Sequence, residues 1–196
     1  MLFPDRLRLP LDFDPDRLAR DLAVAEGSGW IGHFVRQTYD GEWDVIPLRA
    51  PVGARRPAAM VLISPMAEHF EDTQVLAACP YFREVLRCFQ TTLRAVRLMR
   101  LAPGSVIKEH VDQLLDVEDG AVRLHIPVIT NSGVDFRING SRVEMAPGTA
   151  WYIGVGNPHS VVNRGPTDRV HLVIDAVLNA WLAELLETAE RAAIVG

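Results

Sequence analysis

Residues 134–145, VDFRINGSRVEM, place Asn139-Gly140 between two segments of alternating polar and apolar residues. Asn-Gly in this setting is the strongest short-range signal for a β-hairpin, because both residues tolerate the positive φ angles of a tight turn. Similar short segments continue on both sides of the hairpin. We predict strands at Val96–Leu101, Ser105–His110, Val122–Ile129, Val134–Ile138, Arg142–Met145, Ala150–Ile153, Ser160–Asn163 and Val170–Ala176. Eight short strands at this spacing favour a sandwich or jelly roll over a parallel sheet.

The segments that flank these strands have a different character. Asp14-Pro15 begins a helix, since aspartate caps helix starts and proline suits the first helical position. We also expect a strand at Asp44–Arg49 and a short helix at Tyr81–Phe89. The last segment, Val177–Ala193, carries leucines at helical spacing, so it packs as an amphipathic helix on the sheets or forms a homodimer contact.

These elements predict one domain over residues 1–196 that is mainly β. Residues 1–92 form a mixed α/β part, residues 93–176 a jelly-roll core, and residues 177–193 a C-terminal helix. A cupin-like, double-stranded β-helix with flanking helices is the expected architecture.

Composition excludes several classes of partner. The chain has 196 residues, 48% of them hydrophobic, and a net charge of −5. It has no basic stripe, which argues against a nucleic-acid partner, and no apolar stretch of about 18 residues, which argues against a membrane span. Cys79 and Cys88 are too few for a disulfide framework, and the N-terminus is unlike a secretory signal. We expect a cytoplasmic protein in a reducing setting.

The sequence Lys108-Glu109-His110-Val111-Asp112 places a histidine and an aspartate at positions i and i+2, which share one face of a strand. His159 can supply a second imidazole. Two histidines and one carboxylate are the ligand set of non-haem Fe(II) oxygenases, with His110, Asp112 and His159 as ligands here. This set leaves three adjacent metal positions open, two for a 2-oxo acid and the third for O2.

Arginine and histidine side chains predict an anion pocket beside these ligands. Arg169 follows His159 by ten residues, and a guanidinium matches the distal carboxylate of 2-oxoglutarate. Arg123 and His125 share a strand face opposite to aliphatic residues, as do Arg169 and His171, and such a buried face is costly without an anion. Each has a plainer alternative. Arg169 can be a surface residue paired with Asp168 or Asp175. Arg123 and His125 can belong to a structural cluster with Asp135, Glu144 or Asp175. His171 can be a core residue.

The stretch Arg97–Asp175 contains RLMRLAPGSVIKEHVD, VRLHIPV, VEMAPGTAWYI, NPHSVVNRG and DRVHLVID, and it resembles the aspartyl/asparaginyl β-hydroxylase family. That family is similar to the bacterial proline cis-4-hydroxylases. The resemblance implies a double-stranded β-helix, Fe(II), 2-oxoglutarate and hydroxylation of an unactivated C–H bond. It gives His110, Asp112 and His159 the metal positions, Arg169 the distal carboxylate, and Arg123 and His125 an element that lies against the co-substrate.

One departure within the family is informative, because the animal members that hydroxylate peptides lack the acidic ligand that Asp112 supplies here. The chain therefore looks closer to the bacterial branch that acts on small molecules.

We accordingly expect a dioxygenase that hydroxylates a small amino-acid-like substrate and releases succinate and CO2. Two alternatives stay open, namely β-hydroxylation of Asp or Asn in a peptide or carrier-bound substrate, and a non-catalytic, metal-binding jelly-roll sensor of a small acid. Substrate choice is expected to lie in the first ninety residues. Candidate substrate contacts are Arg36, Arg49, Arg94, Arg97 and Trp43, each as readily a surface or core residue, whereas His33 and His69 are expected to be structural or exposed.

Overall fold

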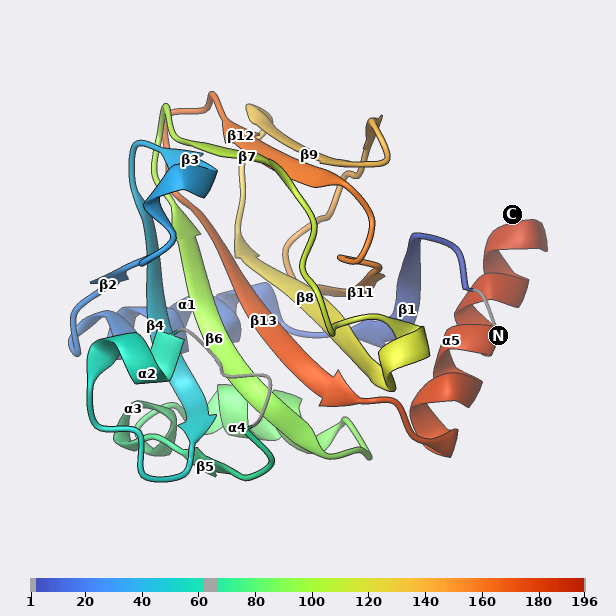
Figure 1. The fold of residues 1–196 in the computed structure, drawn as a ribbon, viewed down its shortest axis with the longest axis horizontal. Helices are drawn as coiled ribbons and strands as arrows, with labels where there is room; N and C mark the ends of the chain where they lie inside the picture. The colour runs from blue at the N-terminus through green and yellow to red at the C-terminus, as the bar shows by residue number, and fades with distance from the viewer. Residues whose placement is uncertain (1–2, 62–66, 196) are drawn as a thin grey trace.

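The computed structural model describes residues 3–61 and 67–195. Its two antiparallel β-sheets face each other (Figure 1). In spatial order the larger sheet consists of β1 (Arg6–Asp12), β11 (Thr149–Ile153), β8 (Ala121–Ile129), β13 (Arg169–Val177), β6 (Leu93–Leu101), β4 (Trp43–Pro51) and β2 (Ile31–Gly32), with β5 (Phe70–Asp72) paired to β4. The smaller sheet consists of β10 (Ser141–Arg142), β9 (Val134–Ile138), β12 (His159–Asn163), β7 (Val106–His110) and β3 (Tyr39–Asp40). The prediction of a mainly β, double-stranded β-helix with flanking helices is confirmed.

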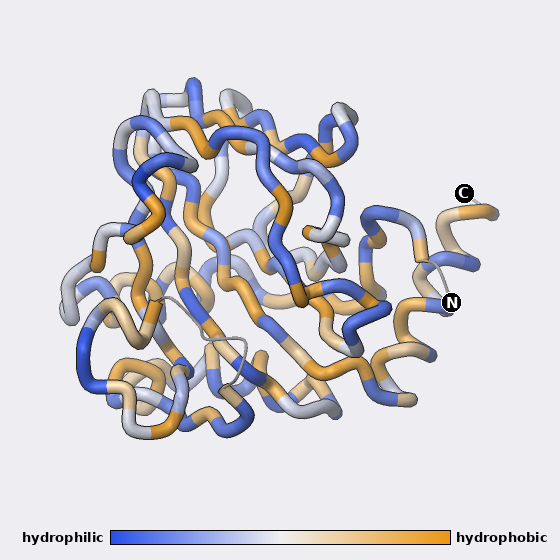
Figure 2. The backbone as a smooth tube through the Cα atoms, viewed as in Figure 1, coloured by the Kyte–Doolittle hydropathy of each residue, from blue (hydrophilic) through white to orange (hydrophobic). Residues whose placement is uncertain are grey.

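The larger sheet separates two cores. One face packs against helices and buries residues such as Leu124, Leu172 and Leu182, and the other faces the smaller sheet across a second cluster that includes Phe136 and Val173. Polar residues interrupt the apolar ones along the central strands in Figure 2. The helical elements are α1 (Pro15–Glu26), η1 (Arg36–Thr38), α2 (Pro57–Val61), α3 (Gln74–Ala77), α4 (Pro80–Arg87), η2 (Val117–Asp119) and α5 (Ala180–Val195).

Helix ends follow local chemistry. The Asp14 side chain accepts hydrogen bonds from the backbone N–H groups of Asp16 and Arg17, at 2.9 and 3.1 Å, so the predicted start of α1 is confirmed. The predicted start of the last helix is three residues too early. β13 continues to Val177, and the Asn179 side chain then caps α5 by accepting from the Leu182 N–H at 2.9 Å.

The C-terminal helix α5 packs on the sheet. Its Leu182 and Leu186 are fully buried, and the helix lies against β1 at one side of the molecule (Figure 1). The expected apolar face is therefore covered within the chain, and the homodimer contact stays a prediction. No helix in residues 3–61 and 67–195 has the length and apolar character needed to cross a membrane.

The Asn139-Gly140 hairpin forms as predicted, with φ angles of +48° and +74° and with Ser141 opposite Ile138. The strand expected at Arg142–Met145 is wrong, because β10 ends at Arg142. Val143 and Met145 instead bury their side chains between the two sheets, and the chain crosses to the larger sheet to begin β11. Apolar burial here outweighs continuation of the sheet.

Strand β1 was not predicted, although it lies at the edge of the larger sheet. Arg6 pairs with Ile153, and Leu7 and Leu9 face the core. The paired residues lie 137 to 147 positions apart in the sequence, so no local turn signal indicates the pairing.

Replacement of Leu9 by alanine tests whether β1 is an integral part of the core. Leu9 is fully buried, so Leu9→Ala should lower the free energy of unfolding by about 2–5 kcal/mol. Urea denaturation of Val24→Ala provides the control, because Val24 is 52% exposed and its loss should change stability by less than about 0.5 kcal/mol. Equal effects of the two variants would contradict a buried β1.

Candidate functional site

A cavity of about 330 Å³ opens between the two sheets. All six predicted site residues line it. The smaller sheet and the loop that follows β7 supply His110, Asp112 and His159, whereas Arg123, His125 and Arg169 come from β8 and β13 of the larger sheet. The two groups, which are distant in sequence, therefore share one cavity.

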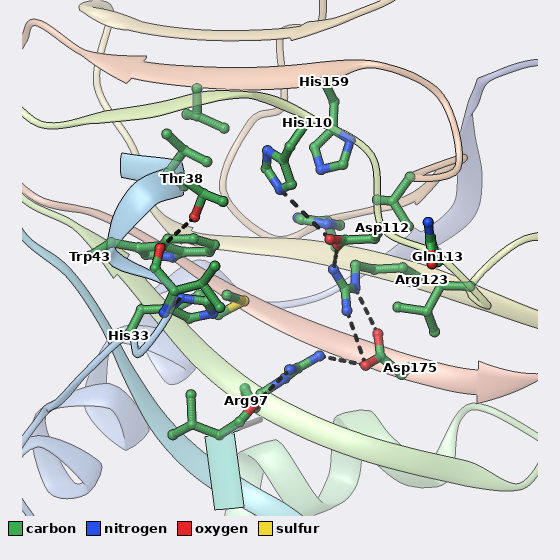
Figure 3. A pocket seen from close by; sticks show the side chains of 18 of the residues that line it. His33, Thr38, Trp43, Arg97, His110, Asp112, Gln113, Arg123, His159 and Asp175 are labelled. Atoms are coloured by element: carbon green, nitrogen blue, oxygen red, sulfur yellow. Dashed lines mark hydrogen bonds and ion pairs between the residues drawn. The ribbon is translucent and has the colours of Figure 1, made fainter. Parts of the chain in front are cut away.

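His110, Asp112 and His159 form a compact cluster, with one potential ligand atom of each within 4.8 Å of the others (Figure 3). His110 and His159 are opposite each other on β7 and β12, and their ring centroids lie 4.3 Å apart. β7 ends at His110, as predicted, and Asp112 lies two residues beyond it in the following loop. Its backbone N–H donates to the Val155 carbonyl at 2.9 Å, which holds the loop against the segment that joins β11 to β12.

Backbone contacts favour one tautomer for both histidines. His110 Nδ1 lies 2.8 Å from the Lys108 carbonyl, and His159 Nδ1 lies 3.0 Å from the Asn157 carbonyl. A carbonyl only accepts, so each Nδ1 must carry a proton and each Nε2 keeps a lone pair. Burial lowers the pKa of His159 to about 4, which keeps this ring neutral. Two imidazole lone pairs beside a carboxylate are the donor set of a divalent transition metal.

Arg123 holds the carboxylate of Asp112 from the side opposite to the histidines. Its Nη1 forms an ion pair with Asp112 Oδ2, while Asp112 Oδ1 lies 3.7 Å from His110 Nε2. Burial alone would raise the pKa of Asp112, but the charge of Arg123 holds that pKa below its ordinary value. The carboxylate therefore stays ionised and keeps one oxygen directed toward the histidines.

Asp175, which the sequence indicates only as a structural ion-pair partner, is a buried carboxylate shared by two arginines. It accepts from Arg123 Nε at 2.7 Å and also pairs with Arg97, as Figure 3 shows. Burial would raise the pKa of Asp175, but Arg123 and Arg97 together hold it below its ordinary value. Arg123 therefore forms the structural cluster with Asp175 that was its alternative role. Contact of Arg123 with a co-substrate stays a prediction.

Arg169 differs from Arg97 and Arg123, which both pair with Asp175. It is 3% exposed, its Nη2 donates to His171 Nδ1 at 2.9 Å, and its Nε has no hydrogen-bond partner in the part of the chain that the structure describes. No ion pair with a carboxylate is found for Arg169 among residues 3–61 and 67–195, so pairing with Asp168 or Asp175 is not what the structure has. Burial lowers its pKa to about 9, which leaves an unbalanced cation at neutral pH.

His33 and Trp43 form a wall of the cavity, with ring centroids 3.7 Å apart and planes 13° from parallel. Trp43 is one of the candidate substrate contacts, and it does line the cavity. His33, which the sequence predicts to be structural or exposed, lines the cavity as well. Burial lowers the pKa of His33 to about 4. Arg97 and Arg94 also line the cavity. His33 lies in a region of short, irregular elements, where no periodic pattern could have indicated its direction.

Replacement of a histidine in the cluster should abolish metal binding. For His110→Ala we expect affinity for Mn(II), measured by calorimetry, to fall at least about 100-fold, because the site keeps only two protein ligands. His69→Ala is the matched control, since His69 is exposed and outside the cavity, and it should bind as the wild type does. Equal affinities for all three proteins would exclude this cluster as the metal site.

Asp175→Asn should destabilise the protein by about 3–5 kcal/mol near pH 7, because it leaves two buried guanidinium groups without their shared partner. The folded-state pKa of Asp175 is depressed, so its contribution is complete above the unfolded pKa of about 4 and is lost as pH falls through the folded-state pKa. Urea denaturation should show the difference from wild type shrinking at low pH. Asp40→Asn, in the exposed pair with Lys108, should cost less than about 1 kcal/mol.

Known proteins share this architecture. A 2OG-Fe(II) oxygenase family oxidoreductase from Burkholderia pseudomallei has a TM-score of 0.55 and 16% identity, covering 89% of this chain and 86% of that one. A Pseudomonas putida prolyl-4-hydroxylase has a TM-score of 0.53 and 13% identity, covering 90% of this chain and 94% of that one. At such identities the likeness shows the fold.

Sequence comparison is more specific. The chain is 28% identical over 184 residues to the L-proline cis-4-hydroxylase of Rhizobium meliloti (strain 1021), which covers 91% of this chain but only 63% of the relative's length. The family model described as Aspartyl/Asparaginyl beta-hydroxylase matches residues 25–178, which include both groups of site residues. The chain belongs to the aspartyl/asparaginyl β-hydroxylase family.

Proposed function

We propose that the chain is an Fe(II)- and 2-oxoglutarate-dependent dioxygenase that hydroxylates an unactivated C–H bond of a small amino-acid-like substrate, with succinate and CO2 as co-products. His110, Asp112 and His159 are the proposed metal ligands, and Arg169 is the proposed partner of the distal carboxylate of 2-oxoglutarate. Arg123 and His125 are proposed to lie beside the co-substrate.

The observation that carries the proposal is a buried, unbalanced arginine in the same cavity as a His-Asp-His cluster. Each feature alone has ordinary explanations. Together they fit a ligand that presents a metal-chelating end and an anionic end, which is the shape of 2-oxoglutarate. A guanidinium paired with a carboxylate at low dielectric forms a strong, directional hydrogen bond.

The protein residues have separate tasks in this scheme. When bound, Fe(II) with 2-oxoglutarate supplies the oxidising power for C–H hydroxylation. Asp112 keeps one oxygen for the metal because Arg123 holds the other, and His110 and His159 keep their Nε2 lone pairs available. Arg169 orients the co-substrate through its distal end.

The remaining part of the cavity supports a small acid as the substrate. Arg97 is 5% exposed and its Nε has no hydrogen-bond partner within the described residues, so it can receive a substrate carboxylate. The His33–Trp43 stack offers a flat apolar surface for the substrate body. Similarity to an L-proline hydroxylase also favours a free amino acid, with L-proline as the first compound to test.

A turnover assay tests the proposal directly. The protein is supplied with Fe(II), ascorbate, 2-oxoglutarate and either single free amino acids or peptides that contain Asp or Asn, and succinate and hydroxylated product are measured by mass spectrometry. We expect succinate in proportion to a singly hydroxylated amino acid. Turnover only with peptides that contain Asp or Asn would favour the peptide β-hydroxylase alternative, and absence of succinate with every substrate would favour a non-catalytic sensor.

Replacement of Arg169 should damage co-substrate binding most. We expect Arg169→Leu to raise the KM for 2-oxoglutarate about 100-fold, because loss of one partner of a buried charge pair costs several kcal/mol. Arg164→Leu is the control, since the Arg164 side chain is 65% exposed, and its KM should be unchanged. An unchanged KM in Arg169→Leu would exclude Arg169 as the carboxylate partner.

A further inference from the structure

His171 lies between Arg169 and His125, and the proposed mechanism does not use it. It is 2% exposed and sits two residues after Arg169 on β13, so both side chains leave the same face of the strand. Its Nδ1 is 2.9 Å from Arg169 Nη2 and 3.3 Å from His125 Nδ1. One ring nitrogen thus contacts two residues that line the cavity.

The chemistry of arginine determines where the protons are. A guanidinium has five donors and no acceptor, so Arg169 must donate and His171 Nδ1 must accept. A neutral His171 therefore carries its proton on Nε2. The contact between His171 Nδ1 and His125 Nδ1 is favourable only when His125 donates, which places the proton of neutral His125 on Nδ1 and leaves its Nε2 as an acceptor.

The surroundings keep both rings neutral. Burial lowers the pKa of His171 well below its ordinary value, and the charge of Arg169 lowers it further. Burial and the charges of Arg169 and Arg123 act on the pKa of His125 in the same direction. No carboxylate among the described residues contacts either ring, so nothing in that part of the chain favours an imidazolium.

His171 also fixes the direction of the guanidinium. Arg169 has no carboxylate partner in residues 3–61 and 67–195, and its Cζ lies 5.8 Å from the centre of the Phe136 ring. Within the described residues, the hydrogen bond to His171 is the directional contact of its head group. His171 also lines a second cavity of about 570 Å³, together with Asn131 and Met145, which has room for water.

We propose that His171 is a positioning residue for the co-substrate, because it holds the Arg169 guanidinium in place through Nδ1 and sets the tautomer of His125. Its part in binding 2-oxoglutarate rests on the proposed function. The direction of the hydrogen bond, from Arg169 to His171 Nδ1, does not. The role requires an acceptor at the position of Nδ1, so an aromatic or aliphatic residue of similar size cannot replace it.

Two replacements separate this role from simple packing. Asparagine can place an amide oxygen near the position of Nδ1 and accept from Arg169, whereas leucine fills space without an acceptor. For His171→Leu we expect the KM for 2-oxoglutarate to rise about 10-fold with kcat changed less than about 3-fold. His171→Asn should restore the KM to within about 3-fold of wild type.

Selectivity between co-substrates distinguishes a positioning role of His171 from a purely structural one, because loss of packing alone should not change it. 2-Oxoadipate is one methylene longer than 2-oxoglutarate, so discrimination between them depends on a fixed distance from the guanidinium to the metal. We expect the ratio of their kcat/KM values to fall about 5-fold or more in His171→Leu and to recover in His171→Asn. An unchanged ratio and KM in a folded His171→Leu would overturn the proposal.

The tautomers can be measured without any activity. In ¹⁵N-labelled, metal-free wild type, ring nitrogen shifts should identify His171 as the Nε2–H tautomer and His125 as the Nδ1–H tautomer. A proton on Nδ1 of His171 would overturn the proposal even if the enzyme is active. If the wild type shows the expected tautomers but does not bind 2-oxoglutarate, the proposed function is rejected. The direction of the hydrogen bond from Arg169 to His171 would still be correct.

Discussion

A charge buried between two β-sheets is costly unless an opposite charge lies beside it, because little water reaches it there. In this protein Asp175 balances Arg97 and Arg123, and Arg123 extends the same pairing to Asp112. The position of the carboxylate beside His110 and His159 therefore depends on an ion-pair chain that begins on the opposite sheet. Arg169 stands outside this chain, and its charge is available to a ligand.

The architecture explains why these residues meet. β8 and β13 are neighbours in the larger sheet, and each alternates aliphatic residues toward the helices with a second set toward the smaller sheet that includes arginine and histidine. β7 and β12 are neighbours in the smaller sheet and bring His110 opposite His159. The jelly-roll connections place the two strand pairs face to face, so one cavity contains both groups.

Much of the core and the six cavity-lining residues that are proposed as the site could be predicted, because a spacing of two positions is local information. His110 with Asp112, Arg123 with His125, and Arg169 with His171 are each two positions apart. The pairing of Arg97 with Asp175 could not be predicted, since it depends on the register of β13 against β6 across 78 residues. His33 lies among short elements without periodicity, and only the folded chain shows that it stacks on Trp43.

The bonds of Arg123 to two carboxylates have a consequence for the loss of one of them. Arg123 is attached to the larger sheet through two bonds to Asp175, and its contact with Asp112 is a third, independent attachment. In a relative that lacks the Asp112 carboxylate, Arg123 would keep its bonds to Asp175, and its Nη1 would become a free hydrogen-bond donor close to His110. Such a donor can bind an anion, so replacement of Asp112 alone would turn the place of a carboxylate into a site for an acidic group.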